Sequence, residues 1–251
     1  MFEAAFAACG LEDWTYQRLP LPVELFEQTV PALRASGFVG ANVTIPHKQA
    51  ALTIADRASD AARAIGAANT LTFAVDGTIE AHNTDAPGLL AAFGGSVVGM
   101  NALVLGAGGS ARAAVWALLD AGAARVSVWN RTPERAFELA RELGAYATDV
   151  AVNAELLVNC TSVGLQRSAS EHDALNQLGL SADQVGKYAY VVDLVYREGL
   201  TPLLAAARRL GVASVGGLDV LVSQGALSFE HWTGKPAPLE AMRRGAGIED
   251  P

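Results

Sequence analysis

Short apolar runs alternate with stretches of helical apolar spacing through the second half of the chain. The runs predict buried strands at residues 102–105, 125–129, 156–159 and 190–194. The helical spacing predicts helices at residues 110–121, 133–143, 201–210 and 218–231. Strands that alternate with helices usually form a parallel sheet covered on both faces, so we expect a doubly wound α/β domain here.

The first part of the chain predicts a smaller α/β domain. Its expected helices are residues 1–9 and 22–36, with another that starts at Ile45-Pro46. Asp85, at its end, is expected to cap a following helix at residues 86–93. Its expected strands are residues 14–19, 38–44, 69–75 and 78–81. Asp76-Gly77, between the last two strands, is typical of a hairpin turn.

Glycines 94, 95 and 99 mark a boundary near residues 85–95. We therefore predict a first domain of residues 1–85 and a second domain of residues 86–217. The helices of residues 218–251 are expected to pack back on the first domain.

A strand, a glycine turn and a helix follow one another at residues 102–121, where residues 106–111 read Gly-Ala-Gly-Gly-Ser-Ala. In a dinucleotide-binding turn, Gly106 permits the sharp turn, Gly108 lets the backbone approach a pyrophosphate, and Ala111 keeps the helix close to the sheet. The free N–H groups and the positive end of the helix dipole then face the phosphates. Glycine turns also serve packing, but this context favours a dinucleotide site.

The next predicted strand ends in Asn130-Arg131-Thr132, where NAD-binding domains normally have Asp or Glu. Arg131 can hold a phosphate with its fork of donors, and Arg112 could add a second positive charge. The alternative is that both arginines are ordinary solvated charges. We favour NADP over NAD.

Residues 159–164, Asn-Cys-Thr-Ser-Val-Gly, follow a later strand. The carboxyl ends of parallel strands line the ligand crevice, so this loop should face the nicotinamide half of the cofactor. A polar turn with local side-chain capping is the alternative.

Lys48 lies at a predicted helix start, where the helix dipole disfavours a cation. A lysine beside a carboxylate in a cleft can exchange protons with an alcohol or ketone. By themselves, a lone lysine and a distant aspartate are more often solvated surface residues. His47 and His82 are expected to be helix-surface or loop histidines.

Composition narrows the class of protein. The chain has 251 residues, 51% of them hydrophobic, and a formal net charge of −8, which argues against a general nucleic-acid binder. Cys9 and Cys160 lack metal-ligand spacing, so we expect reduced thiols, no metal and a cytoplasmic protein. No apolar run reaches the ~20 residues of a membrane span, and the first residues do not resemble a signal peptide.

Taken together, these motifs resemble shikimate dehydrogenase, in one order over essentially the whole chain. The matching stretches are residues 40–48, 69–70, 83–85, 106–111, 130–132, 159–164, 193–196, 201–204 and 217–224. The resemblance implies two α/β domains, with a closing cleft between them, and reversible hydride transfer between NADPH and 3-dehydroshikimate, which gives shikimate for aromatic amino-acid biosynthesis. A monomer or homodimer with a small-molecule substrate is expected.

The resemblance also implies residue roles. Lys48 and Asp85 match the catalytic pair, and Thr44, Asn69, Tyr196 and Gln224 match residues that bind the substrate. The implied cofactor-binding residues are Gly106, Ala107, Gly108, Gly109, Ser110, Asn130, Arg131, Thr132, Leu194 and Gly217, with Asp60 as a minor contact.

One family feature has no match in the printed sequence. The family begins with a strand and a Ser-x-Ser loop that holds the substrate carboxylate, whereas here Met1 falls where the first helix has begun. We therefore expect weak substrate binding and low stability, with cofactor binding largely intact. The alternatives are a quinate/shikimate dehydrogenase that uses NAD and a catalytically weak nucleotide-binding form.

Overall fold

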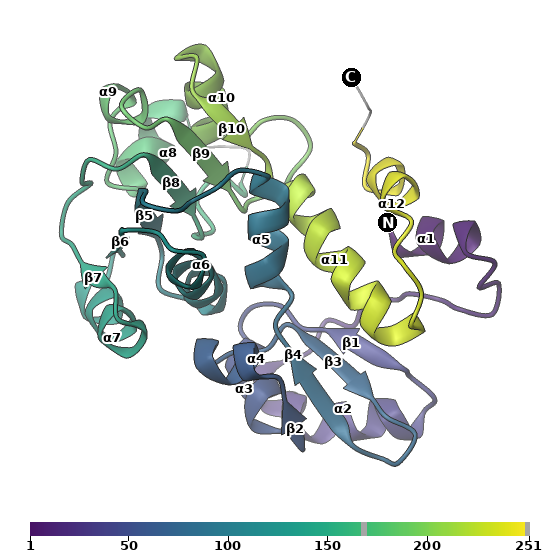
Figure 1. The fold of residues 1–251 in the computed structure, drawn as a ribbon. Coiled ribbons are helices and arrows are strands. Elements are labelled where there is room, and N and C mark those ends of the chain that lie inside the picture. Colours follow the sequence, from purple (N-terminus) through teal and green to yellow (C-terminus); the bar gives the residue numbers. More distant parts are fainter. Residues whose placement is uncertain (167–169, 249–251) are drawn as a thin grey trace. The chain divides into compact units, whose positions relative to one another are not determined.

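The chain forms two units, each with its own sheet. The computed structural model describes residues 1–166 and 170–248. The first unit comprises Met1–Gly88 together with the chain from Val222 onward, and the second unit comprises Leu89–Leu221. The divisions fall inside helices α5 (Asp85–Phe93) and α11 (Gly217–Thr233). Figure 1 shows the elements of both units.

The second unit is built on a six-stranded sheet with the strand order β10-β9-β8-β5-β6-β7. Every pair of neighbouring strands is parallel, which confirms the doubly wound α/β fold. The strands are β5 (Asn101–Leu105), β6 (Arg125–Trp129), β7 (Tyr146–Ala147), β8 (Leu156–Asn159), β9 (Tyr190–Asp193) and β10 (Ala213–Val215). The two edge strands β7 and β10 were not predicted, because two or three residues show no readable apolar pattern.

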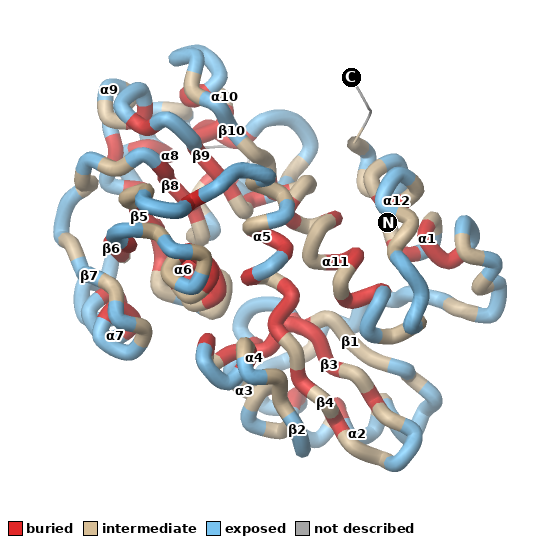
Figure 2. The backbone as a smooth tube through the Cα atoms, in the orientation of Figure 1, coloured by how far each residue is buried: buried red, intermediate tan, exposed pale blue. Residues whose placement is uncertain are grey.

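Successive residues of the central strand β5 pack on opposite faces of this sheet. Ala102 and Val104 join the core under α5, α6 (Gly109–Asp120) and α7 (Pro133–Leu143). Leu103 and Leu105 join the core under α8 (Glu171–Gln177), α9 (Ala182–Val185) and α10 (Pro202–Arg209). Strands that are buried on both faces appear in the sequence as continuous apolar runs. Figure 2 shows this buried centre in red.

The sheet of the first unit is mixed, with the order β1-β3-β4-β2. Strands β3 (Thr70–Phe73) and β4 (Ile79–His82) form the predicted hairpin, and β1 (Gly40–Asn42) pairs antiparallel with β3. Strand β2 (Arg57–Ala58) is parallel to β4. Helices α2 (Phe26–Ala35), α3 (Lys48–Thr53) and α4 (Asp60–Ile65) belong to the same unit, with a short 3₁₀ helix (Val23–Leu25) before α2.

Both ends of the described chain pack against α11. Phe2 and Phe6 of α1 (Phe2–Ala8) share a buried cluster with Phe229 of α11 and Met242 of α12 (Leu239–Gly245). The Met1 amino group donates a hydrogen bond to the Gly245 carbonyl at 2.9 Å. Helix α11 is therefore an anchoring element of the first unit.

One local prediction for the first unit is wrong, and two predicted elements have different bounds in the structure. Residues 14–19 are not a strand, because none of them pairs with a strand in the described chain, and the Tyr16 amide donates instead to Glu3 Oε1 at 2.7 Å. The predicted strand at 38–44 is reduced to Gly40–Asn42. The helix expected from Pro46 begins at Lys48, because a turn closed by the His47 amide and the Thr44 carbonyl precedes it.

In residues 1–166 and 170–248, no helix is both long enough and apolar enough to cross a membrane.

Candidate active site

Lys48 and Asp85 form a nearly buried ion pair in the first unit. Lys48 Nζ lies 2.5 Å from Asp85 Oδ2, and the two side chains are 10% and 15% exposed. Lys48 is the first residue of α3, and Asp85 is the first residue of α5. The structure thus brings into contact two side chains that are 37 residues apart in the sequence.

Asp85 also explains why a lysine occurs at a helix start. Its carboxylate offsets the unfavourable interaction of the ammonium with the positive end of the α3 dipole. Asp85 was expected to cap α5, but its side chain faces Lys48. Asn83 caps the helix instead. Asn83 Oδ1 accepts a hydrogen bond from the Ala86 amide at 3.2 Å, while its Nδ2 donates to the Ala67 carbonyl at 2.9 Å. The Asp85 carboxylate is therefore available for the ion pair.

Asn69 has one amide orientation that satisfies its neighbours. Its Oδ1 accepts the Thr84 backbone N–H at 2.7 Å. Its Nδ2 donates to Asp85 Oδ1 at 2.8 Å and faces Gln224 Oε1 at 3.1 Å. A flipped amide would set an NH₂ group against a backbone donor and an oxygen against a carboxylate. Asn69 therefore links the ion pair to α11.

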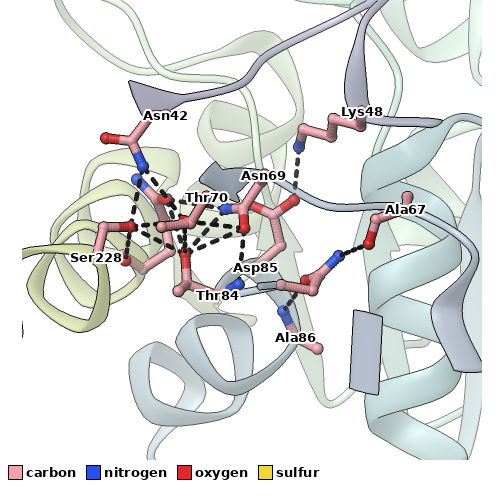
Figure 3. A network of polar contacts seen from close by, with 11 residues as sticks. Asn42, Lys48, Ala67, Asn69, Thr70, Thr84, Asp85, Ala86 and Ser228 are labelled. Carbon is pink, nitrogen blue, oxygen red and sulfur yellow. Dashed lines mark hydrogen bonds and ion pairs between the residues drawn. The ribbon is translucent and has the colours of Figure 1, made fainter. Parts of the chain in front are cut away.

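Three buried hydroxyl groups, those of Thr70, Thr84 and Ser228, lie next to Asn69 (Figure 3). Thr70 Oγ1 lies 2.8 Å from Ser228 Oγ and 3.2 Å from Thr84 Oγ1, and the Thr84 and Ser228 oxygens are 3.3 Å apart. Thr84 Oγ1 also lies 3.2 Å from Asn69 Oδ1. We call Thr70, Thr84 and Ser228 the hydroxyl cluster. Satisfied buried networks of this kind fix the side chains they contact.

Helix α11 approaches α5 very closely beside this network. A Cβ atom added at Gly88 would lie 2.7 Å from Gln224 Cβ and 2.8 Å from Gln224 Cα. Glycine at position 88 therefore allows α11 to bring Gln224 to Asn69. Ser228 follows Gln224 by four residues, so both side chains are on the same face of α11.

This arrangement can move a proton next to a bound polar molecule. An ammonium group has three N–H donors, so Lys48 can bind Asp85 and still donate to a ligand oxygen. The nearby amides of Asn69 and Gln224 are suited to hydroxyl or carboxylate groups. The site thus combines a charged proton donor with neutral groups for orientation.

Two predicted site residues of the first unit lie outside this network. Thr44 is exposed in the turn before α3, and its carbonyl accepts the His47 amide. Asp60 is the first residue of α4, and its exposed carboxylate contacts Arg63 Nη2 at 2.5 Å.

The histidines are not simple surface residues as predicted. His47 is buried, stacks on Phe26 and lies 2.8 Å from the Leu21 carbonyl through Nε2. The rings of the half-buried His82 and the more exposed His231 stack with centroids 4.0 Å apart. Burial lowers the pKa of both rings, and repulsion by His231 lowers the pKa of His82 further.

The glycine turn of the second unit has the geometry of a nucleotide cradle. Gly106 has φ +110°, and an added Cβ would lie 3.2 Å from the Cys160 backbone, so the turn excludes a side chain there. A Cβ added at Gly108 would meet nothing within 4 Å, which leaves this backbone open to a ligand. Helix α6 starts at Gly109 with no side-chain cap, and the positive end of its dipole at this start is suited to an anion. Ala107 and Ser110 belong to the same turn.

The polar residues after β6 extend this cradle. Asn130 Nδ2 donates to the Thr132 carbonyl at 2.8 Å, and Arg131 is exposed. Arg112 Nη1 lies 2.7 Å from Glu142 Oε2 of α7, so a carboxylate partly offsets the second positive charge that was expected beside the cradle. Arg131 is therefore the better candidate for a phosphate contact.

Leu194, Tyr196 and Gly217 follow the last two strands of the same sheet, β9 and β10. Leu194 and the exposed Tyr196 follow β9, and Gly217 starts α11. A Cβ at Gly217 would lie 2.5 Å from the Val195 carbonyl oxygen and 2.7 Å from that of Leu194. Glycine at this position therefore lets α11 begin directly against the loop after β9.

Several residues of the network had no role assigned from sequence. These residues are Asn42 and the hydroxyl cluster. Asn42 Nδ2 donates a hydrogen bond to Ser228 Oγ at 2.9 Å. Thr70 and Thr84 directly adjoin the predicted residues Asn69 and Asp85, and the spacing of Ser228 from Gln224 was the only sign of its position. In the described chain, no group of three or more His, Cys, Asp or Glu residues could hold a metal.

Family models match three stretches of the chain. Residues 1–71 match the shikimate dehydrogenase substrate binding domain, and residues 90–178 match shikimate / quinate 5-dehydrogenase. Residues 217–244 match the shikimate 5'-dehydrogenase C-terminal domain.

Relatives and solved structures agree with these matches. The chain is 45% identical to shikimate dehydrogenase (NADP(+)) of Acidiphilium cryptum, over 94% of this chain and 86% of that protein. It is 42% identical to shikimate dehydrogenase (NADP(+)) of Thermus thermophilus, over 99% of this chain and 93% of that protein. A crystal structure of shikimate 5-dehydrogenase from Thermus thermophilus in complex with NADP(H) and shikimate has a TM-score of 0.86 and 40% identity, and covers 98% of this chain and 92% of that one.

Proposed function

The chain belongs to the shikimate dehydrogenase family, and we propose that Lys48 and Asp85 perform the proton transfer of its reaction. The reaction is the reversible, NADPH-dependent reduction of 3-dehydroshikimate to shikimate in aromatic biosynthesis. The alternative of an NAD-dependent quinate enzyme is not favoured, because the relatives are NADP-dependent shikimate dehydrogenases. The observation that supports the residue roles is the nearly buried contact between Lys48 Nζ and Asp85 Oδ2.

Lys48 is the proton donor for the reduced oxygen. Bound NADPH supplies the hydride that adds to the carbonyl carbon of the substrate. As the carbonyl electron pair moves to oxygen, the Lys48 ammonium stabilises the developing alkoxide and gives it a proton. In the reverse direction, neutral Lys48 accepts the hydroxyl proton.

Asp85 and Asn69 set the position of Lys48 and of the substrate. The Asp85 carboxylate holds the Lys48 side chain in place through their 2.5 Å contact and accepts a hydrogen bond from Asn69 at 2.8 Å. Asn69 and Gln224 bind substrate hydroxyl or carboxylate groups, and Thr44 and Tyr196 are further substrate contacts. Because the hydroxyl cluster fixes the Asn69 amide, these donors are oriented before the substrate arrives.

The second unit fits NADP at three places. The open backbone at Gly108 and the uncapped start of α6 suit the pyrophosphate. Arg131, after β6, suits the 2′-phosphate that distinguishes NADP from NAD. Leu194 and Gly217 stand at the carboxyl ends of the strands, where the nicotinamide half binds in open parallel sheets. Asp60 is a minor contact.

We also propose that the chain acts in the cytoplasm, without nucleic acid, as a monomer or homodimer. Cys9 and Cys160 form no disulfide bond with each other, and the net charge of −8 disfavours binding to a phosphate backbone.

The proposed function is tested by four substrate and cofactor combinations. Oxidation of shikimate or quinate is followed with NADP⁺ or NAD⁺, and shikimate with NADP⁺ is expected to have the highest kcat/KM. Loss of one charged hydrogen-bonding contact corresponds to about 10–100-fold in affinity, so Arg131→Ala should reduce the preference for NADP⁺ by that factor. Arg141→Ala, at the other end of α7, is the matched control. Equal use of NADP⁺ and NAD⁺ by the wild type would overturn the assignment of Arg131.

A further inference from the structure

A fully buried carboxylate stands where strands β8 and β9 end. Asp193 is the last residue of β9 and is paired in register with Asn159, the last residue of β8. Its Oδ1 accepts hydrogen bonds from Asn159 Nδ2 at 2.8 Å and from the Val195 amide at 3.1 Å. Its Oδ2 accepts one from the Thr201 hydroxyl. One carboxylate thus links β8, the loop after β9 and the start of α10.

The groups around Asp193 are arranged for its ionised form. The Val195 N–H can only donate. The Asn159 amide points its NH₂ group at Asp193, because Asn159 Oδ1 accepts the Thr161 amide at 3.0 Å and the Thr161 hydroxyl at 2.8 Å. Burial raises the pKa of Asp193 to about 6, with the bonds from Thr201, Val195 and Asn159 and the charge of Arg197 acting in the opposite direction. At neutral pH the group is therefore a carboxylate.

Two of the partners of Asp193, Asn159 and Thr201, each fix a further segment. Thr161, held by Asn159, accepts the Val163 amide at 3.1 Å and shapes the loop after β8. Thr201 caps α10 by accepting the Leu204 amide at 3.2 Å.

The Arg197 side chain connects the loop after β8 with the loop after β9 through a second set of hydrogen bonds. Its Nη1 donates to the Gly164 and Gln166 carbonyls, each at 3.2 Å, and its Nη2 donates to the Leu200 carbonyl at 2.7 Å. The loops at residues 160–166 and 194–200 are thus connected both through the buried carboxylate and through this guanidinium.

These loops border the cradle for the cofactor. The Cys160 amide donates to the carbonyl of Leu105, directly before the glycine turn, at 2.8 Å. The Val195 carbonyl lies against Gly217. Ligands of open parallel sheets bind outside the carboxyl ends of the strands, where both loops start.

We propose that Asp193 is a positioning residue for the nicotinamide end of NADP, because its carboxylate holds the loops at residues 160–166 and 194–200 in the conformation that accepts the ring. Asp193 is fully buried and does not itself touch the cofactor. The inference rests on the proposed function, since it takes NADP to bind along this edge of the sheet.

Asp193→Asn tests the role of the charge in a side chain of the same shape. The variant keeps one oxygen for Asn159 and Val195 but sets an NH₂ group against the Thr201 hydroxyl. In the protein without ligand, we expect faster amide hydrogen exchange in both loops. By calorimetry, the dissociation constant of NADP⁺ should rise about tenfold, as expected for the loss of one charged hydrogen bond.

Two controls separate positioning from general stability. Val191→Ala removes buried apolar volume from the same strand and should lower stability while leaving the NADP⁺ dissociation constant unchanged. Thr201→Val should weaken NADP⁺ binding, and Thr201→Ser, which keeps the donor, should restore it. The difference between wild type and Asp193→Asn should also shrink below about pH 6, where the wild-type carboxylate takes up its proton.

The proposal is overturned if Asp193→Asn binds NADP⁺ as tightly as the wild type, or if Val191→Ala weakens binding equally. Failure of the proposed function would give a different result. A chain that binds NADP⁺ without oxidising shikimate would refute that function, while loop exchange and NADP⁺ affinity would still report on Asp193.

Discussion

Gly88→Ala tests whether the contact between α5 and α11 positions Gln224. The added Cβ would lie 2.7–2.8 Å from Gln224 Cβ, Cα and N, and ordinary van der Waals contact begins at 3.4 Å. Two of the opposing atoms belong to the backbone, so the side chain of Gln224 cannot avoid the overlap by changing rotamer. The helices must therefore separate by about 0.7 Å, the difference between 3.4 and 2.7 Å.

The displacement affects both stability and catalysis. Overpacking costs about 1–3 kcal/mol, and the higher helix propensity of alanine returns about 1 kcal/mol, so we expect a net loss of up to about 2 kcal/mol. The Asn69–Gln224 contact would lengthen from 3.1 Å to beyond hydrogen-bond distance. A misplacement of this size in an active site lowers kcat/KM by about 10–100-fold, with a higher KM for shikimate.

Thermal unfolding and steady-state kinetics measure these two effects. Gly186→Ala is the matched control, because Gly186 has φ −65° and an added Cβ would meet its nearest atoms only at 3.7 Å. That substitution should leave kinetics unchanged and stabilise the protein by about 0.4–1 kcal/mol. If Gly88→Ala behaved like Gly186→Ala, the contact would not position Gln224 and the reasoning would be refuted.

Two further predictions concern the hydroxyl cluster and the stacked histidines. Thr84→Val should lower the free energy of unfolding by about 1–3 kcal/mol and reduce kcat/KM, because it leaves buried polar groups unpaired. Thr84→Ser should retain most of the stability and most of kcat/KM. Equal effects of the two substitutions would refute the role of the hydroxyl. Because burial lowers the pKa of His82 and His231 in the folded state, the unfolded chain binds more protons below about pH 6.5, and stability should fall as pH decreases from there. Urea unfolding at pH 5 to 7 measures how the free energy of unfolding changes with pH, and His82→Phe should make this change smaller. An unaltered pH dependence in the variant would contradict the prediction.

The parallel sheet could be predicted because its strands are buried on both faces. Leu103 and Val104 pack on opposite sides, so the strand appears as an uninterrupted apolar run. The edge strands β7 and β10 are too short to leave such a pattern. Residues 14–19 were predicted as a strand but do not form one. A local pattern can indicate that a segment is suited to a strand, but it does not show whether another strand lies beside it to pair with.

The candidate site was predictable only in part. Residue spacing left Lys48 as an ordinary surface lysine, and only the resemblance to a known family paired it with Asp85. Ser228 lies 158 residues from Thr70, and their 2.8 Å contact depends on how α11 packs on the first sheet. Asn83 caps α5 in place of Asp85, because both residue types can cap a helix and only the three-dimensional position of Lys48 decides between them.

Lys48→Met is the most direct test of the central claim, that the Lys48–Asp85 pair transfers the proton in this enzyme. Loss of a general acid–base group predicts a kcat about 10²–10⁴-fold lower for shikimate oxidation. The dissociation constant of NADP⁺, measured by calorimetry on the same preparation, should remain unchanged. The exposed Lys187, replaced in the same way, is the control. A Lys48→Met enzyme that folds, binds NADP⁺ and keeps the wild-type kcat would contradict the account.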